Sequence, residues 1–140
     1  MRGSPLAHIV VEIASAAGLA GAFWQSEHFH LRLPNPPWMD LVIESWPVSH
    51  SQRHISVAHY FEQNGDLVPD PEVEMTEYGD PVSLSQALGY TEVRDASTRS
   101  DVLLFLDMWA RNIRDQGFID AARRYATDRL VVTPHHGPQV

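Results

Sequence analysis

The stretch 54–78 constrains the fold of this chain most, because two segments of alternating hydrophobicity meet there at Asn64-Gly65. This dipeptide is typical of a tight β-hairpin turn, since glycine lacks a Cβ atom and asparagine tolerates a positive φ angle. We therefore predict an antiparallel strand pair that turns at the dipeptide. Pro69 and Pro71 interrupt the second strand. Because proline cannot donate a ladder hydrogen bond, we expect this strand to be an edge strand or to contain a bulge.

The register of this hairpin has two alternatives. A two-residue turn would place Val57 opposite Glu72, whereas a three-residue loop through Asp66 would place Val57 opposite Val73. A shift of one residue moves every side chain of a strand to the other face. We expect the three-residue loop, because it brings the apolar faces of the two strands together.

The segments before the hairpin predict one helix and two strands. Ser4-Pro5 is typical of a helix start, and the apolar residues that follow recur at helical spacing up to Gly18. Period-2 alternation then predicts strands over residues 29–33 and 39–46, separated by a proline-rich corner.

The segments after the hairpin favour helices. Ser83 followed by Gln86 matches a capping box, which predicts a short helix that ends at Gly89. Its apolar residues would cover one end of the core; they are Leu84, Ala87 and Leu88. Residues 90–99 suit a polar linker or a short strand.

Two further helices are expected towards the C-terminus. The longer one begins at Thr98 or Ser100 and ends at Gly117, and a shorter one covers 119–129. Residues 130–132 suit a short strand.

This order of elements predicts an α+β domain over residues 1–133, followed by a C-terminal tail over 134–140. Its parts are an N-terminal helix, a four-stranded antiparallel meander, and C-terminal helices packed on one sheet face. The other sheet face must then stay in water or cover a partner.

Charge and composition exclude several classes of function. The formal net charge is -8, and all ten basic residues are arginine. The absence of lysine excludes Schiff-base and P-loop lysine mechanisms, and the absence of cysteine excludes thiolate chemistry. The acidic balance argues against general binding to nucleic-acid backbones, whereas it permits binding to basic protein surfaces.

We expect a cytoplasmic protein without a membrane span. Glu12 interrupts the N-terminal apolar run, so this run does not suit a signal peptide. No stretch reaches the roughly 20 apolar residues of a transmembrane helix.

Seven carboxylates gather in and after the hairpin: Glu62, Asp66, Asp70, Glu72, Glu74, Glu77 and Asp80. Three interpretations are open. The charges could simply solvate an edge strand, they could form a surface for a basic partner, or they could join His59 in a metal or acid/base site. For a metal, the weak candidates are His59, Asp66 and Asp70, and we expect no cofactor.

Alternation places two aromatic residues, Trp46 and Tyr60, on the sheet face away from the helices. Such residues can anchor a partner. The same alternation puts His59 with the apolar set, which favours a hydrogen-bonded core histidine over a ligand. No HExxH, GxSxG or glycine-rich phosphate loop occurs.

The run HYFEQNGDLVPDPE over residues 59–72, with FLDMWARNIRDQGF further on, resembles an uncharacterised family of domains of unknown function. The resemblance covers about residues 28–120. It implies a bacterial setting on mobile elements such as plasmids and phages, and it transfers no activity.

The sequence thus favours a small acidic protein that is not an enzyme and binds another macromolecule, with an inhibitor of a host defence complex as one form. The expected partner-binding residues are Glu62, Asp66, Asp70, Glu72, Glu74, Trp46 and Tyr60. The first alternative is a metal-assisted hydrolase that uses His59 with Asp66, Asp70 or Glu72. The second is a homodimer formed through the open sheet face.

Overall fold

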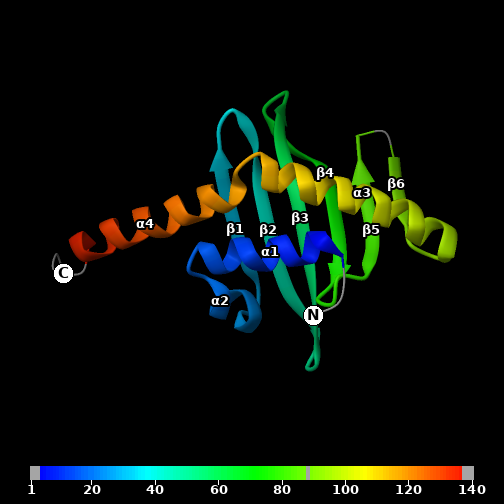
Figure 1. The fold of residues 1–140 in the computed structure, drawn as a ribbon, viewed down its shortest axis with the longest axis horizontal. Coiled ribbons are helices and arrows are strands. Elements are labelled where there is room, and N and C mark those ends of the chain that lie inside the picture. The colour runs from blue at the N-terminus through cyan, green and yellow to red at the C-terminus, as the bar shows by residue number, and fades with distance from the viewer. Residues whose placement is uncertain (1–3, 88, 137–140) are drawn as a thin grey trace.

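The computed structural model describes residues 4–87 and 89–136 of the 140-residue chain. Two helices come first, then six strands, then two longer helices (Figure 1). Their bounds are α1 Pro5–Ala16, α2 Ala20–Gln25, β1 Phe29–Asn35, β2 Trp38–Ser49, β3 Gln52–Gln63, β4 Asp66–Thr76, β5 Pro81–Gln86, β6 Gly89–Glu92, α3 Ala96–Asp115 and α4 Phe118–His136.

All six strands form one antiparallel sheet in the order of the sequence, so a hairpin joins each strand to the next. The α+β class and the antiparallel meander are confirmed, but the sheet has six strands rather than the expected four. The two additional strands are β5 and β6.

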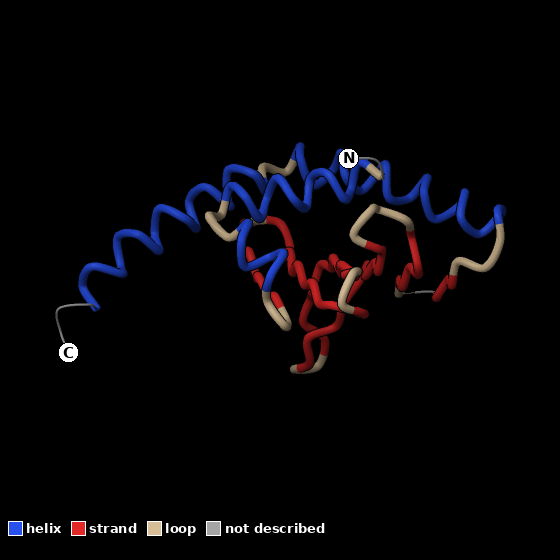
Figure 2. The backbone as a smooth tube through the Cα atoms, turned by 90° about the horizontal axis from the view of Figure 1, so that it is seen from below, coloured by secondary structure: helices blue, strands red, loops and turns tan. Residues whose placement is uncertain are grey.

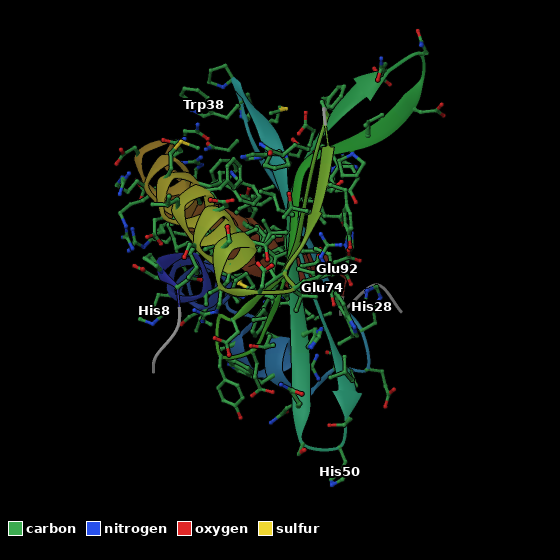
Figure 3. All side chains as sticks on the ribbon, turned by 90° about the vertical axis from the view of Figure 1, so that its right-hand side faces the viewer. His8, His28, Trp38, His50, Glu74 and Glu92 are labelled. Carbon is green, nitrogen blue, oxygen red and sulfur yellow. The ribbon has the colours of Figure 1, made fainter. Side chains whose placement is uncertain are left out.

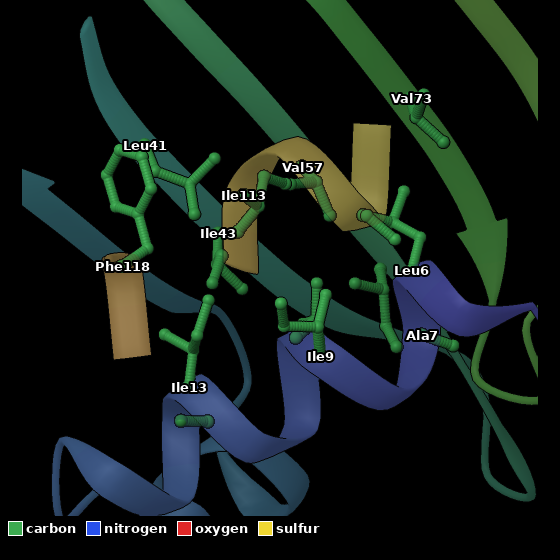
Figure 4. Packing of buried hydrophobic residues seen from close by; sticks show 14 of the residues in the cluster. Leu6, Ala7, Ile9, Ile13, Leu41, Ile43, Val57, Val73, Ile113 and Phe118 are labelled. Carbon is green, nitrogen blue, oxygen red and sulfur yellow. The ribbon is translucent and has the colours of Figure 1, made fainter. Parts of the chain in front are cut away.

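Helix α1 forms where its cap and spacing predicted it. The Ala7 backbone N–H donates to Ser4 Oγ at 3.3 Å, and Pro5 lies in the first turn, where no intrahelical N–H is needed. Leu6, Ile9 and Ile13 are buried on one face. This face packs against the sheet, which fixes α1 across the strands (Figure 4).

The hairpin of β3 and β4 has the expected pairing of Val57 with Val73, but a bulge rather than a longer turn produces it. Val57 lies opposite Val73, but the turn contains two residues, because Gln63 pairs with Asp66. Asn64 and Gly65 have φ angles of 53° and 86°, as such a turn requires. The three-residue loop was therefore wrong.

A bulge in β4 restores the register. The regular pairing is broken between Ala58 and Tyr60, where one residue of β3 faces two residues of β4 between Pro69 and Glu72. The two prolines thus lie where the ladder is interrupted. Strand β4 pairs with both β3 and β5, so the alternative of an edge strand was wrong.

The short helix expected at Ser83 is the strand β5. Leu84 lies opposite Val73 and is buried, whereas Ser83 and Ser85 lie opposite Glu74 and Glu72. A helix would have put Leu84 and Ala87 on one face, but Ala87 is exposed. Leu88 lies outside the described residues. The short strand considered for residues 90–99 is present as β6.

Helix α3 begins earlier than expected, with Asp95 rather than Thr98 or Ser100 as its N-cap. Thr98 is instead the third residue of the helix and completes a capping box, in which its N–H donates to Asp95 Oδ1 at 2.9 Å. Gly117 follows the helix with a φ angle of 84°.

Helix α4 is longer than expected, and the strand considered for residues 130–132 is helical. Of the expected tail, residues 134–136 are assigned to α4, and residues 137–140 lie outside the described residues.

The helices lie on one side of the sheet (Figure 2). The hydrophobic core fills the space between the two layers, where Leu41 of the sheet lies beside Phe118 of α4 and Ile43 lies beside Ile13 of α1 (Figure 4). No described helix covers the opposite sheet face, which we call the open face. Within residues 4–87 and 89–136, no helix combines the length and the apolarity needed to cross a bilayer.

Candidate binding surface on the open sheet face

A row of polar side chains crosses the open face on all six strands. The cross-strand pairs link His30, Glu44, Ser56, Glu74, Ser83 and Glu92. Their neighbours along the strands, such as Ile43 and Val73, are buried in the core, so the row points the other way.

Glutamates and serines alternate along this row. The glutamates stand on β2, β4 and β6, and the serines stand on β3 and β5 between them. Glutamates two strands apart are separated by about 9–10 Å at the backbone, because neighbouring strands lie about 4.8 Å apart. The small serines leave room between the carboxylates.

The centre of this face is a depression of about 320 Å³. It is lined by Glu44, Trp46, Ser56, Glu72, Glu74, Ser83, Ser85 and Tyr90. The lining holds three carboxylates, three aliphatic hydroxyls and two aromatic side chains, and none of these side chains is basic. The depression therefore presents mostly hydrogen-bond acceptors.

Histidines flank two of the glutamates. His54 Nδ1 lies 2.7 Å from Glu74 Oε2, and His28 Nε2 lies 3.0 Å from Glu44 Oε2. Figure 3 views the sheet from the side of β6 and shows Glu74, Glu92 and His28 away from α1 and α3. On the open face, Arg32 pairs with Asp40, with 2.7 Å between Nε and Oδ2.

The pKa of Tyr60 responds to the negative charge of this surface. Partial burial raises the pKa of its phenol, and the charges of Glu72 and Glu44 raise it further, whereas Arg32 acts in the opposite direction. Two glutamates from different strands therefore act on the same point of the open face.

The structure brings together four of the seven expected partner-binding residues. Trp46, Tyr60, Glu72 and Glu74 lie on the open face. Glu62 and Asp66 are exposed near the hairpin turn instead. Asp70 lines a separate depression of about 410 Å³ beside the turn between β5 and β6.

Sequence reasoning missed Glu44, Glu92 and Tyr90 as members of this surface. Glu44 shares the parity of Trp46 along β2, which was an available signal. Glu92 and Tyr90 could only be found once residues 81–92 were known to be a strand pair.

His59 belongs to the core, as alternation predicted. Its ring packs against Trp109 and Phe118, with ring centroids 5.4 and 5.7 Å away. Its Nδ1–H donates to the Asp40 carbonyl oxygen at 3.2 Å, since a carbonyl can only accept. Burial lowers the pKa of His59, and its hydrogen bonds to backbone carbonyls only partly oppose this.

The weak metal candidates lie in different surroundings. His59 is buried under the helices, Asp66 is exposed beside the turn, and Asp70 lines its own depression. In the part of the chain that the structure describes, no three His, Asp or Glu side chains are grouped as metal ligands.

Comparison with known families gives a match over most of the chain. The model of a domain of unknown function, DUF6908, covers residues 9–119. The chain belongs to the DUF6908 family. No curated protein and no solved structure matches it significantly.

The DUF6908 match includes all six strands and α3. Every residue of the candidate surface therefore lies in the family domain, whereas most of α4 lies beyond it. The expected kinship to a domain of unknown function is confirmed over a longer stretch than residues 28–120.

Proposed function

We propose that this DUF6908 protein is a small, acidic binding module without enzymatic activity, which acts in the cytoplasm and receives a basic protein surface on its open face. One observation carries the proposal. A row in which glutamate and serine alternate reaches every strand from β2 to β6, on a sheet face that no described helix covers.

Electrostatics favours a basic partner. Glu44, Glu72 and Glu74 line one depression, and Arg32 is neutralised locally by Asp40. Such a field attracts basic surfaces and speeds their association, whereas it repels the phosphates of nucleic acids.

We infer one form of this function from the mobile-element setting that the family resemblance implies. The partner would be a host defence complex, and the glutamates would occupy a basic surface that otherwise binds nucleic-acid phosphates. Carboxylate–arginine pairs would form the contact.

The metal-assisted hydrolase and the homodimer remain alternatives that no specific observation favours. The hydrolase would need His59 to converge with Asp66, Asp70 or Glu72. The side chains of His59 and Glu72 lie on opposite faces of the sheet.

Affinity capture from the native host, read by quantitative mass spectrometry, tests the proposal. The bait is the wild type, an open-face variant with Glu72→Arg and Glu74→Arg, or a control variant with Asp101→Arg and Asp128→Arg. The control makes the same charge change at exposed sites on α3 and α4. We expect basic partners that bind the wild type and the control but not the open-face variant. An identical set of partners for all three baits would contradict the proposal.

A further inference from the structure

Building on the proposed function, we infer that the open face selects arginine over lysine: its occupant is a protein segment whose guanidinium groups pair with the glutamates and stack on Trp46 and Tyr90. The proposal names a chemical feature of the partner that charge alone does not specify.

The acceptors of the depression suit a guanidinium group. Arginine presents five N–H donors in a planar fork, whereas lysine presents three donors on a compact, strongly hydrated ammonium. The depression offers the carboxylates of Glu44, Glu72 and Glu74 together with three serine hydroxyls. A carboxylate can receive the fork with two parallel hydrogen bonds, and neighbouring hydroxyls can accept the remaining donors.

The side chains that lie between the glutamates are small. Ser56, Ser83 and Ser85 are the smallest side chains of the lining, and they separate the glutamates of β2 and β4 from one another and from β6. The Ser56 hydroxyl donates to Glu72 Oε2 at 3.5 Å, so a hydroxyl and a carboxylate lie close enough to contact the same ligand group.

Two aromatic rings lie at the border of the acidic centre. Tyr90 on β6 is 65% exposed, and Trp46 on β2 is half-buried. Both line the same depression as the glutamates. A guanidinium can stack on such a ring while its edge pairs with a carboxylate, but an ammonium cannot use the ring in this way.

Charge complementarity identifies the occupant as a basic segment of another protein. Three carboxylates and no basic side chain line the depression, so a second copy of this face or a nucleic-acid backbone would meet charge of its own sign. An arginine-rich segment supplies the opposite charge.

Calorimetric titration of the full chain with two peptides tests the inference. The peptides have the same length and net charge, and they carry either four arginines or four lysines among glycine and serine. At low ionic strength, where surface charges are least screened, we expect the arginine peptide to bind about fivefold more tightly than the lysine peptide.

Ring variants separate this selectivity from a general preference of protein surfaces for arginine. Tyr90→Ala should reduce the ratio of the two affinities to about twofold or less, whereas Tyr90→Phe, which keeps the ring, should retain it. Trp46→Ala and Trp46→Phe provide a second pair. Glu72→Gln with Glu74→Gln should weaken both peptides, and Asp101→Asn with Asp128→Asn should weaken neither.

The outcomes distinguish the inference from the proposed function. Equal affinities for the two peptides, or a preference that survives both ring-to-alanine changes, would overturn the inference and leave the basic-partner proposal standing. If neither peptide binds, the inference and the basic-partner proposal are both overturned.

Discussion

His59 shows how a titratable residue can be a structural part of the core. It is 6% exposed, and its ring lies between Trp109 and Phe118 while Nδ1–H reaches a backbone carbonyl. Burial in these surroundings disfavours the charged imidazolium. The residue is therefore neutral in the folded protein at neutral pH.

This neutral state predicts a loss of stability in mild acid. Because the folded-state pKa of His59 is lowered, the unfolded chain takes up its proton first, near the ordinary value of about 6.5. The contribution of His59 is complete above that pH and declines as the pH falls towards the folded-state pKa. We expect the free energy of unfolding, measured by urea titration, to decrease between about pH 7.5 and 5.

The variant His59→Phe tests the assignment of this pH dependence to one residue. Phenylalanine keeps a ring against Trp109 and Phe118 but cannot be protonated. Its loss of stability between the two pH values should be smaller than that of the wild type. Equal pH dependence in the two proteins would refute the assignment.

At the scale of elements, strand β5 is where sequence reasoning failed. Ser83, Gln86 and Gly89 match the start and stop signals of a helix, and those signals are local. The strand is stabilised instead by pairing with β4 and β6 on either side and by the burial of Leu84. Tertiary pairing overrode local propensity, and a single sequence contains no direct signal of it.

Two substitutions test which face of β5 is buried. Leu84→Ala should lower the free energy of unfolding by about 2–4 kcal/mol, because it leaves a cavity beside Val73. Ser85→Ala, on the open face, should change it by less than about 0.5 kcal/mol. Urea titration measures both values. Similar losses for the two variants would contradict this assignment of the buried face.

The bulge in β4 divides the hairpin into an upper part next to the turn and a lower part that contains Val73 and Met75. Val73 and Met75 are buried, whereas Gln63 and Asp66 beside the turn are exposed. The register of the lower part is therefore fixed by burial, and the register of the upper part depends more on the turn.

Deletions on either side of this boundary should differ in their effect. Removing Asp70 leaves one residue of β4 facing one residue of β3, so the bulge is lost while both parts of the hairpin can keep their pairing. Removing Glu74 moves Met75 out of the core, which costs at least about 2 kcal/mol. We expect thermal denaturation to show a much lower melting temperature for the second deletion. The reverse order would show that the bulge does not buffer the register.

At the scale of the molecule, the charge of the open face predicts the oligomeric state. Two copies that met through this face would oppose glutamates to glutamates, which is unfavourable when salt is low. Sedimentation equilibrium should therefore give the mass of one 15.8 kDa chain at low ionic strength. A dimer that weakens when salt is added would contradict this expectation and favour the homodimer alternative.

The sequence predicted a minority of the residues of the candidate surface. Alternation placed Trp46 and Tyr60 on the face away from the helices, because the two-residue period of a strand can be read from neighbouring residues alone. Glu72 and Glu74 were expected as partner-binding residues of the acidic hairpin. Alternation could not supply Glu92, since that residue joins the row only through pairing between β5 and β6. Surfaces built across strands depend on strand order, which a single sequence does not display.

The position of the helices also has a consequence for how a guest would be received. They pack on one face of the sheet, so the spacing of the side chains on the opposite face is set before a partner binds. The partner must then adapt its own conformation to a preorganised surface and bear most of the entropic cost of ordering. Disordered basic tails, which become ordered only on binding, suit such a surface.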